Sequence, residues 1–250
     1  TNSAVAAART GKRVGVFSLE MRRMQLEDRL LSSLSGVYLS QILGGYVGEK
    51  DWPQISQAMS GMKDLPIEID DRAHQTVRDI RSACRRMKVE RGLDLVVIDY
   101  VQLITGSLDR RGATRNEEMT DISRRIKLLA DEVTAPVLLV SQLSRANDKR
   151  PDPMPRLSDL RESGALEQDA DLVCFLHRKN HREGGLTYFI CEKQRQGPTG
   201  TFNLTLNRDS VTFTDGGEEP PEPQAAEKAE KRVKTREKPQ PQRSFTGESD

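Results

Sequence analysis

Short apolar runs alternate with longer amphipathic segments along most of the chain. The runs have the length of β-strands, and the segments between them repeat apolar residues every three or four positions, as helices do. This alternation is typical of a parallel sheet covered by helices. The predicted strands are residues 13–19, 66–70, 95–99, 136–141, 172–176, 186–191, 201–206 and 211–214.

Helices are predicted between most of these strands. Thr76 with Asp79, and Thr114 with Glu117, have the spacing of a capping box, in which side chains satisfy the free N–H groups at the start of a helix. From Tyr188 onward the strands follow one another without helices, which predicts an antiparallel extension at the C-terminal edge of the sheet. The expected fold class is therefore α/β, with a mainly parallel sheet flanked by helices. The predicted helices are residues 1–8, 21–35, 51–62, 77–91 and 115–133.

Composition divides the chain into two parts. The 36 residues 215–250 include five apolar, 16 charged and five proline residues. So little apolar surface cannot offset the chain entropy lost on folding, and this part is predicted to be a disordered charged tail. The expected folded body, residues 1–214, has 32 basic and 29 acidic residues, so its net charge does not single out a nucleic-acid-binding protein.

The sequence shows no feature of a membrane or secreted protein. No apolar run reaches the roughly 18 residues of a transmembrane helix, and no signal peptide is visible. The three cysteines are an odd number without a C-x-x-C pair, and they are interpreted as small buried side chains in a reducing compartment. These features predict a cytoplasmic protein that does not bind membranes.

Polar residues follow three predicted strands at their carboxyl ends, where ligands bind in open α/β sheets. They are Glu20, Asp99 and Gln142. This set of side chains suits nucleotide chemistry. One carboxylate can hold magnesium, a second can polarise an attacking water, and the amide can sense a phosphate oxygen. The alternative for Glu20 and Asp99 is that each caps the helix that follows it.

A phosphate-binding loop is not recognisable in the sequence. The pattern G-x-x-x-x-G-K-[ST] supplies backbone N–H groups and a lysine to phosphates, and no segment matches it. Gly11 and Lys12 are followed by Arg13 and lack the upstream glycine, so they are interpreted as the turn into the first strand. Any phosphate loop is expected before Thr1.

Six segments together resemble the motor domain of the bacterial replicative DNA helicase of the DnaB type. Two of them, D-L-R-E-S-G-x-x-E-Q-D-A-D and K-Q-R-x-G-P-x-G, are far more specific than the apolar run that ends in Asp99. The resemblance covers about residues 1–214 and implies a RecA-like ATPase fold. The segments are residues 17–21, 51–52, 97–103, 141–145, 158–171 and 192–200.

The resemblance implies a role for each of the three residues at the strand ends. Members of this family form a homo-hexameric ring around single-stranded DNA and hold ATP between neighbouring subunits. Glu20 would activate the attacking water, Asp99 would hold Mg²⁺, and Gln142 would couple the γ-phosphate to the DNA-binding loops. The implied activity is ATP-dependent 5′–3′ unwinding of duplex DNA at the replication fork.

Three basic residues are implied to complete the nucleotide site. Lys193 and Arg195 would reach the phosphates held by the next subunit, because a planar guanidinium stabilises the charge spread over a transferring phosphoryl group. Arg29 matches a family arginine near the nucleotide interface. Without the resemblance, a Lys-x-Arg pair at a strand end is interpreted as a solvated rim.

The resemblance also implies a DNA-binding loop. Arg161, Glu162 and Gly164 match the family loop that grips the DNA backbone, where glycine allows close approach and arginine adds charge. A second interpretation, compatible with the first, is that Asp159 and Glu162 cap a short helix around Leu166.

Other polar segments have less specific interpretations. The basic residues 103–115 and 145–156 are interpreted as mobile loops that face a pore or a partner. His177 and His181 lie in a basic turn interpreted as a hairpin tip, because no third zinc ligand is near.

The sequence departs from the full pattern of the family. It contains neither the phosphate loop, nor the N-terminal domain that contacts primase in the family, nor the linker helix. We therefore expect a C-terminal fragment of a longer protein, which binds primase and the helicase loader through its other parts. Truncation is one explanation. A gene interrupted by an intein is another, because splicing resumes at Ser, Thr or Cys and Thr1 fits. The 250-residue chain alone is predicted to have negligible ATPase activity.

Two other functions stay open. One is a catalytically inactive RecA-like module that binds DNA or a partner ring. The presence of all five expected catalytic residues, Glu20, Asp99, Gln142, Lys193 and Arg195, argues against it. The other is a RecA-like ATPase of the recombination or circadian-clock type, which the K-Q-R-x-G-P-x-G segment disfavours.

Overall fold

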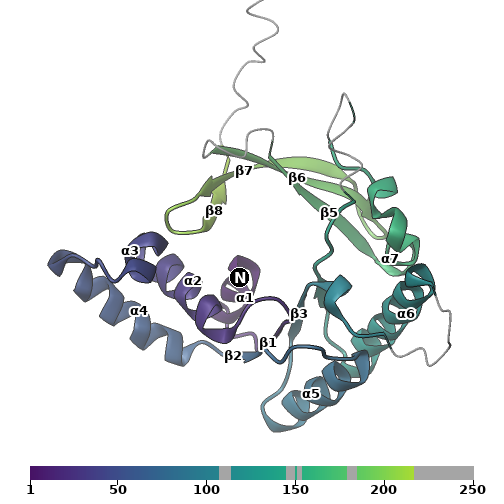
Figure 1. Ribbon diagram of the computed structural model, residues 1–250, viewed down its shortest axis with the longest axis horizontal. Helices are drawn as coiled ribbons and strands as arrows, with labels where there is room; N and C mark the ends of the chain where they lie inside the picture. The colour runs from purple at the N-terminus through teal and green to yellow at the C-terminus, as the bar shows by residue number, and fades with distance from the viewer. Residues whose placement is uncertain (107–113, 145–149, 151–153, 179–184, 217–250) are drawn as a thin grey trace, which may run out of the picture. The chain divides into compact units, whose positions relative to one another are not determined.

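The computed structural model describes residues 1–106, 114–144, 150, 154–178 and 185–216. In this part of the chain, two four-stranded sheets are formed (Figure 1). The strands are β1 Val14–Ser18, β2 Ile67–Asp70, β3 Leu95–Asp99, β4 Val137–Leu139, β5 Leu172–His177, β6 Gly185–Gln194, β7 Gly200–Asn207 and β8 Thr212–Asp215. The helices are α1 Asn2–Arg9, α2 Arg23–Ser35, α3 Leu39–Gly44, α4 Trp52–Asp64, α5 Val77–Glu90, α6 Arg115–Val133 and α7 Gly164–Asp169, with 3-10 segments η1 Glu49–Asp51, η2 Val101–Leu103 and η4 Leu157–Ser163.

The first sheet is parallel and has the strand order β2-β1-β3-β4. Val14 of β1 lies opposite Ile67 of β2 on one side and Leu95 of β3 on the other. Parallel strands need a crossover between them, which explains why helices separate these strands in the sequence. Because all four strands run the same way, their carboxyl ends lie along one edge.

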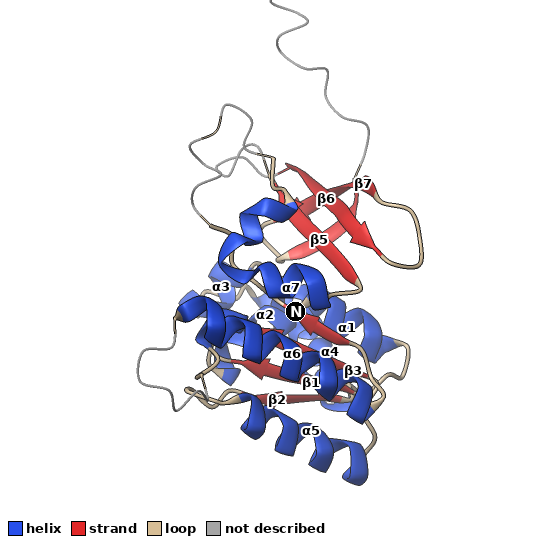
Figure 2. Ribbon diagram, turned by 90° about the vertical axis from the view of Figure 1, so that its right-hand side faces the viewer, coloured by secondary structure: helices blue, strands red, loops and turns tan. Residues whose placement is uncertain are grey.

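Helices cover both faces of this sheet (Figure 2). Val96 and Ile98 of β3 belong to the largest apolar cluster, in which α5 and α6 pack on one face. Val97, between them, packs with Ala4 and Ala8 of α1 on the opposite face. Successive side chains of a strand point to opposite faces, so a strand buried on both sides reads as a continuous apolar run. The predicted α/β class is confirmed.

The second sheet is antiparallel and has the strand order β5-β6-β7-β8. It confirms the predicted antiparallel strands at the C-terminal edge, which in the described residues form a sheet of their own. Val173, Phe175, Tyr188 and Ile190 of β5 and β6 form a separate apolar cluster with Leu160 of η4. This sheet therefore has a core of its own beside the parallel sheet.

Two helix starts have the predicted capping boxes. Thr76 N donates to the Asp79 carboxylate at 2.9 Å, and Asp79 N donates to Thr76 Oγ1 at 3.3 Å. Thr114 and Glu117 make the same two bonds at the start of α6, at 2.8 and 3.3 Å. Within the described ranges, no helix is both long and apolar enough to cross a membrane.

Candidate active site

Glu20 and Asp99 lie at neighbouring strand ends. In the register of β1 and β3, Ser18 is opposite Asp99, and Leu19 N donates to Asp99 O at 2.8 Å. Glu20 is the next residue and is exposed, whereas Asp99 is partly buried. The structure therefore brings the two predicted carboxylate residues to the same edge of the parallel sheet.

Neither carboxylate caps the helix that follows it. The N-cap of α2 is Arg22, whose N–H donates to Gln25 Oε1 at 3.1 Å, and the N-cap of η2 is Tyr100. Among the described residues, Glu20 and Asp99 also take part in no ion pair. The capping alternative is wrong, and both carboxylates are left to interact with solvent or a ligand.

The start of α1 lies beside Asp99. Asp99 and Arg29 both interact electrostatically with the backbone at Thr1. These effects require both side chains to be within electrostatic reach of Thr1, which is the N-cap of α1. Arg29, partly buried on α2, thus lies at the same end of the sheet as Asp99.

Gln142 lies beyond the third strand end and is held by a residue for which no role was predicted. The Gln102 Nε2 donates to Gln142 O at 3.1 Å and to Ser141 Oγ at 3.0 Å, and Gln102 Oε1 accepts from Gln142 N at 3.2 Å. The sequence signals for Gln102 are its position three residues after Asp99 and its place in the segment 97–103, which is one of those that carry the resemblance.

Arg115 fixes the other side of Gln102. Its guanidinium donates to Gln102 O at 2.6 Å and pairs with Glu118 at 2.9 Å. A cavity of about 100 Å³ lies beside these contacts. It is lined by Gln102, Arg115, Met119, Gln142, Leu143, Ser144, Asp159 and Leu160. Arg115, interpreted as part of a basic loop, is therefore tied to the fold.

Lys193 and Arg195 lie together at the C-terminal end of α7. Lys193 Nζ donates to Glu167 O at 2.5 Å, and Arg195 donates to Gln168 O at 2.8 Å. Arg195 also pairs with Asp171 at 3.0 Å. Unpaired carbonyls at the end of a helix favour cations, which explains why both side chains settle there.

This basic pair is separate from the strand-end carboxylates. Asp171 pairs with Lys127 of α6 as well as with Arg195, and the Lys127 hydrogen bond is the main reason why the pKa of Asp171 is below its usual value. The helix α7 lies beside α6, apart from α1 and α2 (Figure 1). Within the described residues, no hydrogen bond or ion pair joins Lys193 or Arg195 to Glu20 or Asp99.

The predicted DNA-binding residues lie at the junction of η4 and α7. Arg161 and Glu162 belong to η4, and Gly164 is the first residue of α7. The side chains of Arg161 and Glu162 lie outside the described part of the structure, as do residues 107–113, 145–149 and 151–153 of the two predicted basic loops and His181.

Asp159 caps η4 rather than the helix around Leu166. Its carboxylate accepts from Arg156 N at 2.9 Å and pairs with Arg150 at 2.7 Å. Gly164 begins α7 directly after η4. The alternative in which Asp159 caps α7 is therefore wrong, because Asp159 is fully engaged one turn earlier.

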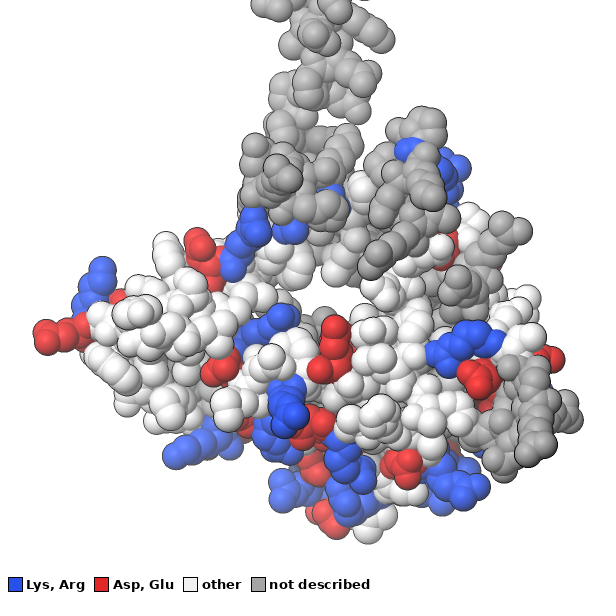
Figure 3. Space-filling model, in the orientation of Figure 1, with Lys and Arg blue, Asp and Glu red and all other residues white. Residues whose placement is uncertain are grey.

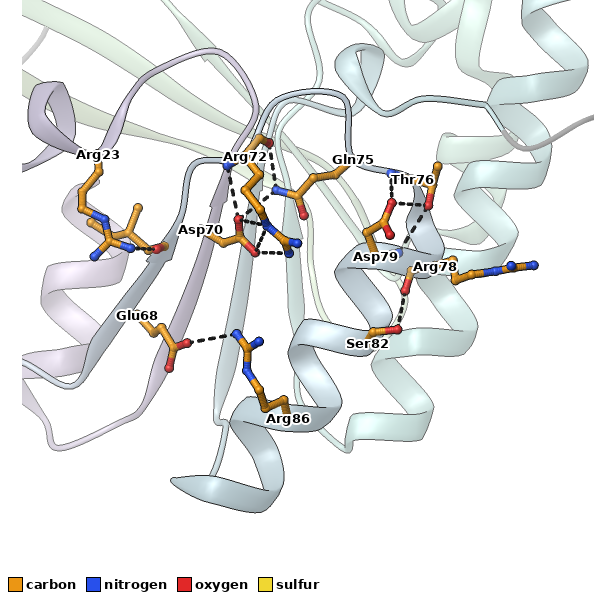
Figure 4. Close-up of polar contacts among 11 residues, drawn as sticks. Arg23, Glu68, Asp70, Arg72, Gln75, Thr76, Arg78, Asp79, Ser82 and Arg86 are labelled. Carbon is orange, nitrogen blue, oxygen red and sulfur yellow. Dashed lines mark hydrogen bonds and ion pairs between the residues drawn. The ribbon is translucent and has the colours of Figure 1, made fainter.

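A further carboxylate, Asp70, ends β2 at the same edge, but the structure satisfies it internally. Asp70 accepts from Arg72 Nε at 2.9 Å, Arg72 Nη2 at 2.6 Å and Gln75 Nε2 at 3.2 Å (Figure 4). The Arg72 hydrogen bond holds the pKa of Asp70 below its usual value. Asp70 therefore holds the turn after β2, whereas Asp99 has no such partner among the described residues.

The carboxylates fit a metal ion that arrives with a nucleotide. Mg²⁺ is usually held by one or two carboxylates together with phosphate oxygens and water. Glu20 and Asp99 supply such carboxylates. In the described ranges, no group of three or more His, Cys, Asp or Glu side chains forms a metal cluster. A metal held by protein ligands alone is therefore not expected from these residues.

Surface charge is mixed on the face drawn in Figure 3. Lys and Arg side chains are interspersed with Asp and Glu there. This agrees with the near-neutral composition of the chain. Nucleic-acid affinity on that face would have to come from a local group of side chains rather than from a broad basic field.

The parallel sheet, its covering helices and the strand-end residues define a RecA-like ATPase fold. The model of the DnaB-like helicase C terminal domain matches residues 1–215, and the chain belongs to this family. Membership implies the use of a nucleotide and a metal.

Known relatives support the same assignment. The chain is 41% identical over 212 residues to the replicative DNA helicase DnaB of Geobacillus stearothermophilus, with 83% of this chain and 46% of that protein covered. It is 40% identical to the replicative DNA helicase DnaC of Bacillus subtilis, with the same coverage. The chain thus spans about half the length of these curated relatives.

Two solved structures share the fold. One, described as an ATPase domain, superposes with a TM-score of 0.80 at 32% identity, covering 86% of this chain and 78% of that one. A DnaB-like replicative helicase, described with its interactions with primase, superposes with a TM-score of 0.79 at 32% identity, covering 87% and 55%.

Proposed function

We propose that this chain is the ATP-hydrolysing motor of a replicative DNA helicase, which unwinds duplex DNA in the 5′–3′ direction as part of a homo-hexameric ring. One observation carries the proposal: Glu20, Asp99 and Gln142 lie at or just beyond the carboxyl ends of three adjacent strands at one edge, where Asp99 is beside the start of α1. The family and the names of the relatives support it.

The three strand-end residues divide the chemistry of ATP hydrolysis. Glu20, exposed and without an ion-pair partner in the described ranges, orients and deprotonates the attacking water. Asp99 would hold Mg²⁺, and the metal would supply positive charge for the phosphate oxygens. Gln142 has its main chain fixed by Gln102, so its side-chain amide is free to contact a phosphate oxygen.

Lys193 and Arg195 act on the nucleotide of the neighbouring subunit. Their distance from Glu20 and Asp99 in the fold suits action in a ring rather than within one subunit, and contacts with α7 hold both cations in place. A guanidinium so fixed loses little entropy when it stabilises the transferring phosphoryl group. Arg29, near Thr1 and Asp99, contributes charge beside the nucleotide of its own subunit.

The DNA-binding loop is connected to the nucleotide site through the cavity beside Gln142. Asp159 and Leu160, which directly precede Arg161, line that cavity together with Gln142. Arg161, Glu162 and Gly164 bind the backbone of single-stranded DNA, and a shift of Gln142 on hydrolysis moves η4.

Several finer predictions belong to the same proposal. The motor domain spans residues 1–214, and residues 215–250 are a charged tail. ATP is the nucleotide and Mg²⁺ the metal. Primase and the helicase loader bind through other parts of the protein. One structural relative is described with its interactions with primase, which fits this proposal. The working compartment is the cytoplasm.

The test is an unwinding assay on a chimera. The part of the Geobacillus stearothermophilus helicase that precedes the region matched here is fused to the start of this chain. The fused part is expected to supply the phosphate loop that this chain lacks. The proposal predicts ATP-dependent strand separation of a fork with a free 5′ tail, and none of a duplex with only a 3′ tail. A hexameric chimera that binds single-stranded DNA without unwinding or hydrolysis would instead favour an inactive DNA-binding module.

A further inference from the structure

Two cysteines face each other across neighbouring strands. Cys174 of β5 lies directly opposite Cys191 of β6 in the antiparallel register. Directly opposed residues in such a pair have Cα atoms about 4.5–5.5 Å apart, which falls inside the range of about 4.4–6.8 Å found across disulfides. Both thiols are free in the structure. A bond between them therefore requires no large movement of the backbone.

The environment of the pair differs from that of the third cysteine. Val173 and Phe175 point into the apolar cluster of the second sheet, so Cys174 between them points to the opposite face. On that face Leu172 and Leu176 are 54% and 57% exposed. Cys174 is partly buried and Cys191 is 5% exposed, whereas Cys84 on α5 is completely buried in the core. A small oxidant can therefore approach the pair at Cys174 but not Cys84.

We propose that Cys174 and Cys191 form a reversible disulfide, a modification site that staples β5 to β6. A small soluble disulfide such as oxidised glutathione is the oxidant. This inference stands on the strand register and burial and does not depend on the proposed helicase function.

The reaction takes place in two exchange steps. The deprotonated Cys174 sulfur attacks one sulfur of glutathione disulfide, the glutathione S–S bond breaks, and one glutathione leaves and takes up the proton that Cys174 lost. The Cys191 sulfur then attacks the Cys174 sulfur, and the second glutathione leaves with the Cys191 proton. The two cysteines lose two electrons, and the glutathione disulfide gains two.

The bond would change contacts at the end of β6. The Cys191 thiol donates to Lys193 O and to Gln194 Oε1, both at 3.7 Å, and a disulfide has no S–H to donate. A register irregularity lies between the cysteine pair and the pair of Val173 with Lys193. If Lys193 acts as proposed above, oxidation also alters the strand that carries it; only this consequence depends on the proposed function.

The experiment uses the full 250-residue chain. The reduced protein is incubated without oxygen at pH 8 in glutathione buffers of increasing oxidised fraction, then acid-quenched, unfolded and alkylated. We expect the number of alkylated thiols to fall from three to one, with a loss of two hydrogens in mass. Tryptic digestion should yield residues 162–178 joined to residues 183–193, and dithiothreitol should restore all three thiols.

Matched variants separate the pair from the third cysteine. Cys84→Ser should form the same bond to the same extent, and Cys174→Ser should form none. Circular dichroism of each variant before oxidation establishes that it is folded. Three free thiols at the most oxidising ratio, a lasting glutathione adduct on Cys174, or a bond that includes Cys84 in the folded chain would each overturn the proposal.

Discussion

The side-chain amide of Gln102 holds the main chain of Gln142 on both its donor and its acceptor side. Its nitrogen donates to Gln142 O at 3.1 Å and its oxygen accepts from Gln142 N at 3.2 Å. A glutamine that closes such a ring of hydrogen bonds fixes both position and orientation of the strand end. The side chain of Gln142 is thereby presented from a rigid support.

Replacing Gln102 with leucine should slow hydrolysis in the chimera. Loss of this support lets Gln142 shift, and a misplacement of about 1 Å costs up to roughly 100-fold in rate, so we expect a decrease of about 10–100-fold. The measurement is the steady-state ATPase rate with the melting temperature recorded alongside. Gln57→Leu, at an exposed position on α4, is the matched control and should leave the rate unchanged. Equal rates for both variants would show that the clamp is not needed.

The 250-residue chain by itself should hydrolyse ATP no faster than a protein-free blank. No glycine-rich phosphate loop occurs in its sequence, so the backbone N–H groups that cradle the phosphates are missing from the site. The measurement is phosphate release at high protein concentration with Mg²⁺ and single-stranded DNA. Robust turnover that Glu20→Gln abolishes would contradict this expectation.

The sequence predicted the strand-end residues but not their partners. The apolar run of β3 and the residue after it indicated Asp99, because a buried parallel strand has a recognisable pattern. The same pattern ends β2 in Asp70, and only the contacts with Arg72 and Gln75 show that this carboxylate is already occupied. Which carboxylate is satisfied depends on a turn whose geometry is not readable from residue types.

Other features escaped prediction for physical reasons. The helix α3 has only six residues, fewer than the roughly 11–18 over which a helical period of apolar residues can be recognised. Strand β4 ends at Leu139, two residues earlier than predicted. The clamp by Gln102 was not foreseeable because a glutamine amide can bond to almost any nearby polar group.

Asp70→Asn should lower the melting temperature at pH 7 by about 3–8 °C, because a charged hydrogen bond whose Arg72 partner is exposed contributes roughly 1.5–2 kcal/mol. The pKa of Asp70 is lowered in the folded protein, mainly by Arg72. The carboxylate therefore stabilises the fold at pH values above 3.8, its pKa in the unfolded chain. That stabilisation is lost as pH falls through the lower folded value. The variant should therefore lose less stability than the wild type between pH 4 and pH 2, measured by thermal melts.

The control for this prediction is Asp64→Asn, an exposed carboxylate at the end of α4. It should shift the melting temperature by less than about 2 °C at either pH, since exposed substitutions usually change stability little. If Asp70→Asn and Asp64→Asn have the same pH dependence, the Asp70 network does not contribute to acid stability.

Arg195→Ala and Arg161→Ala should separate hydrolysis from DNA binding in the chimera. The first should lower the ATPase rate on the order of 1,000-fold with little change in stability, because its ion pair with Asp171 is exposed. The second should first weaken the affinity for single-stranded DNA, measured by fluorescence anisotropy at a fixed salt concentration. Arg91→Ala, at the exposed end of α5, is the control for both assays. Equal loss of both activities in both variants would argue against this division of roles.

The most direct test of the strand-end site is the DNA-stimulated ATPase rate of the chimera with Glu20→Gln. Glutamine keeps the size of the side chain but cannot accept a proton from the attacking water. Removal of a general base costs about 100-fold or more, so the rate should fall by at least that factor while nucleotide affinity stays within about twofold. A variant that retains the wild-type rate would contradict the assignment of Glu20, and with it the site formed by Glu20 and Asp99.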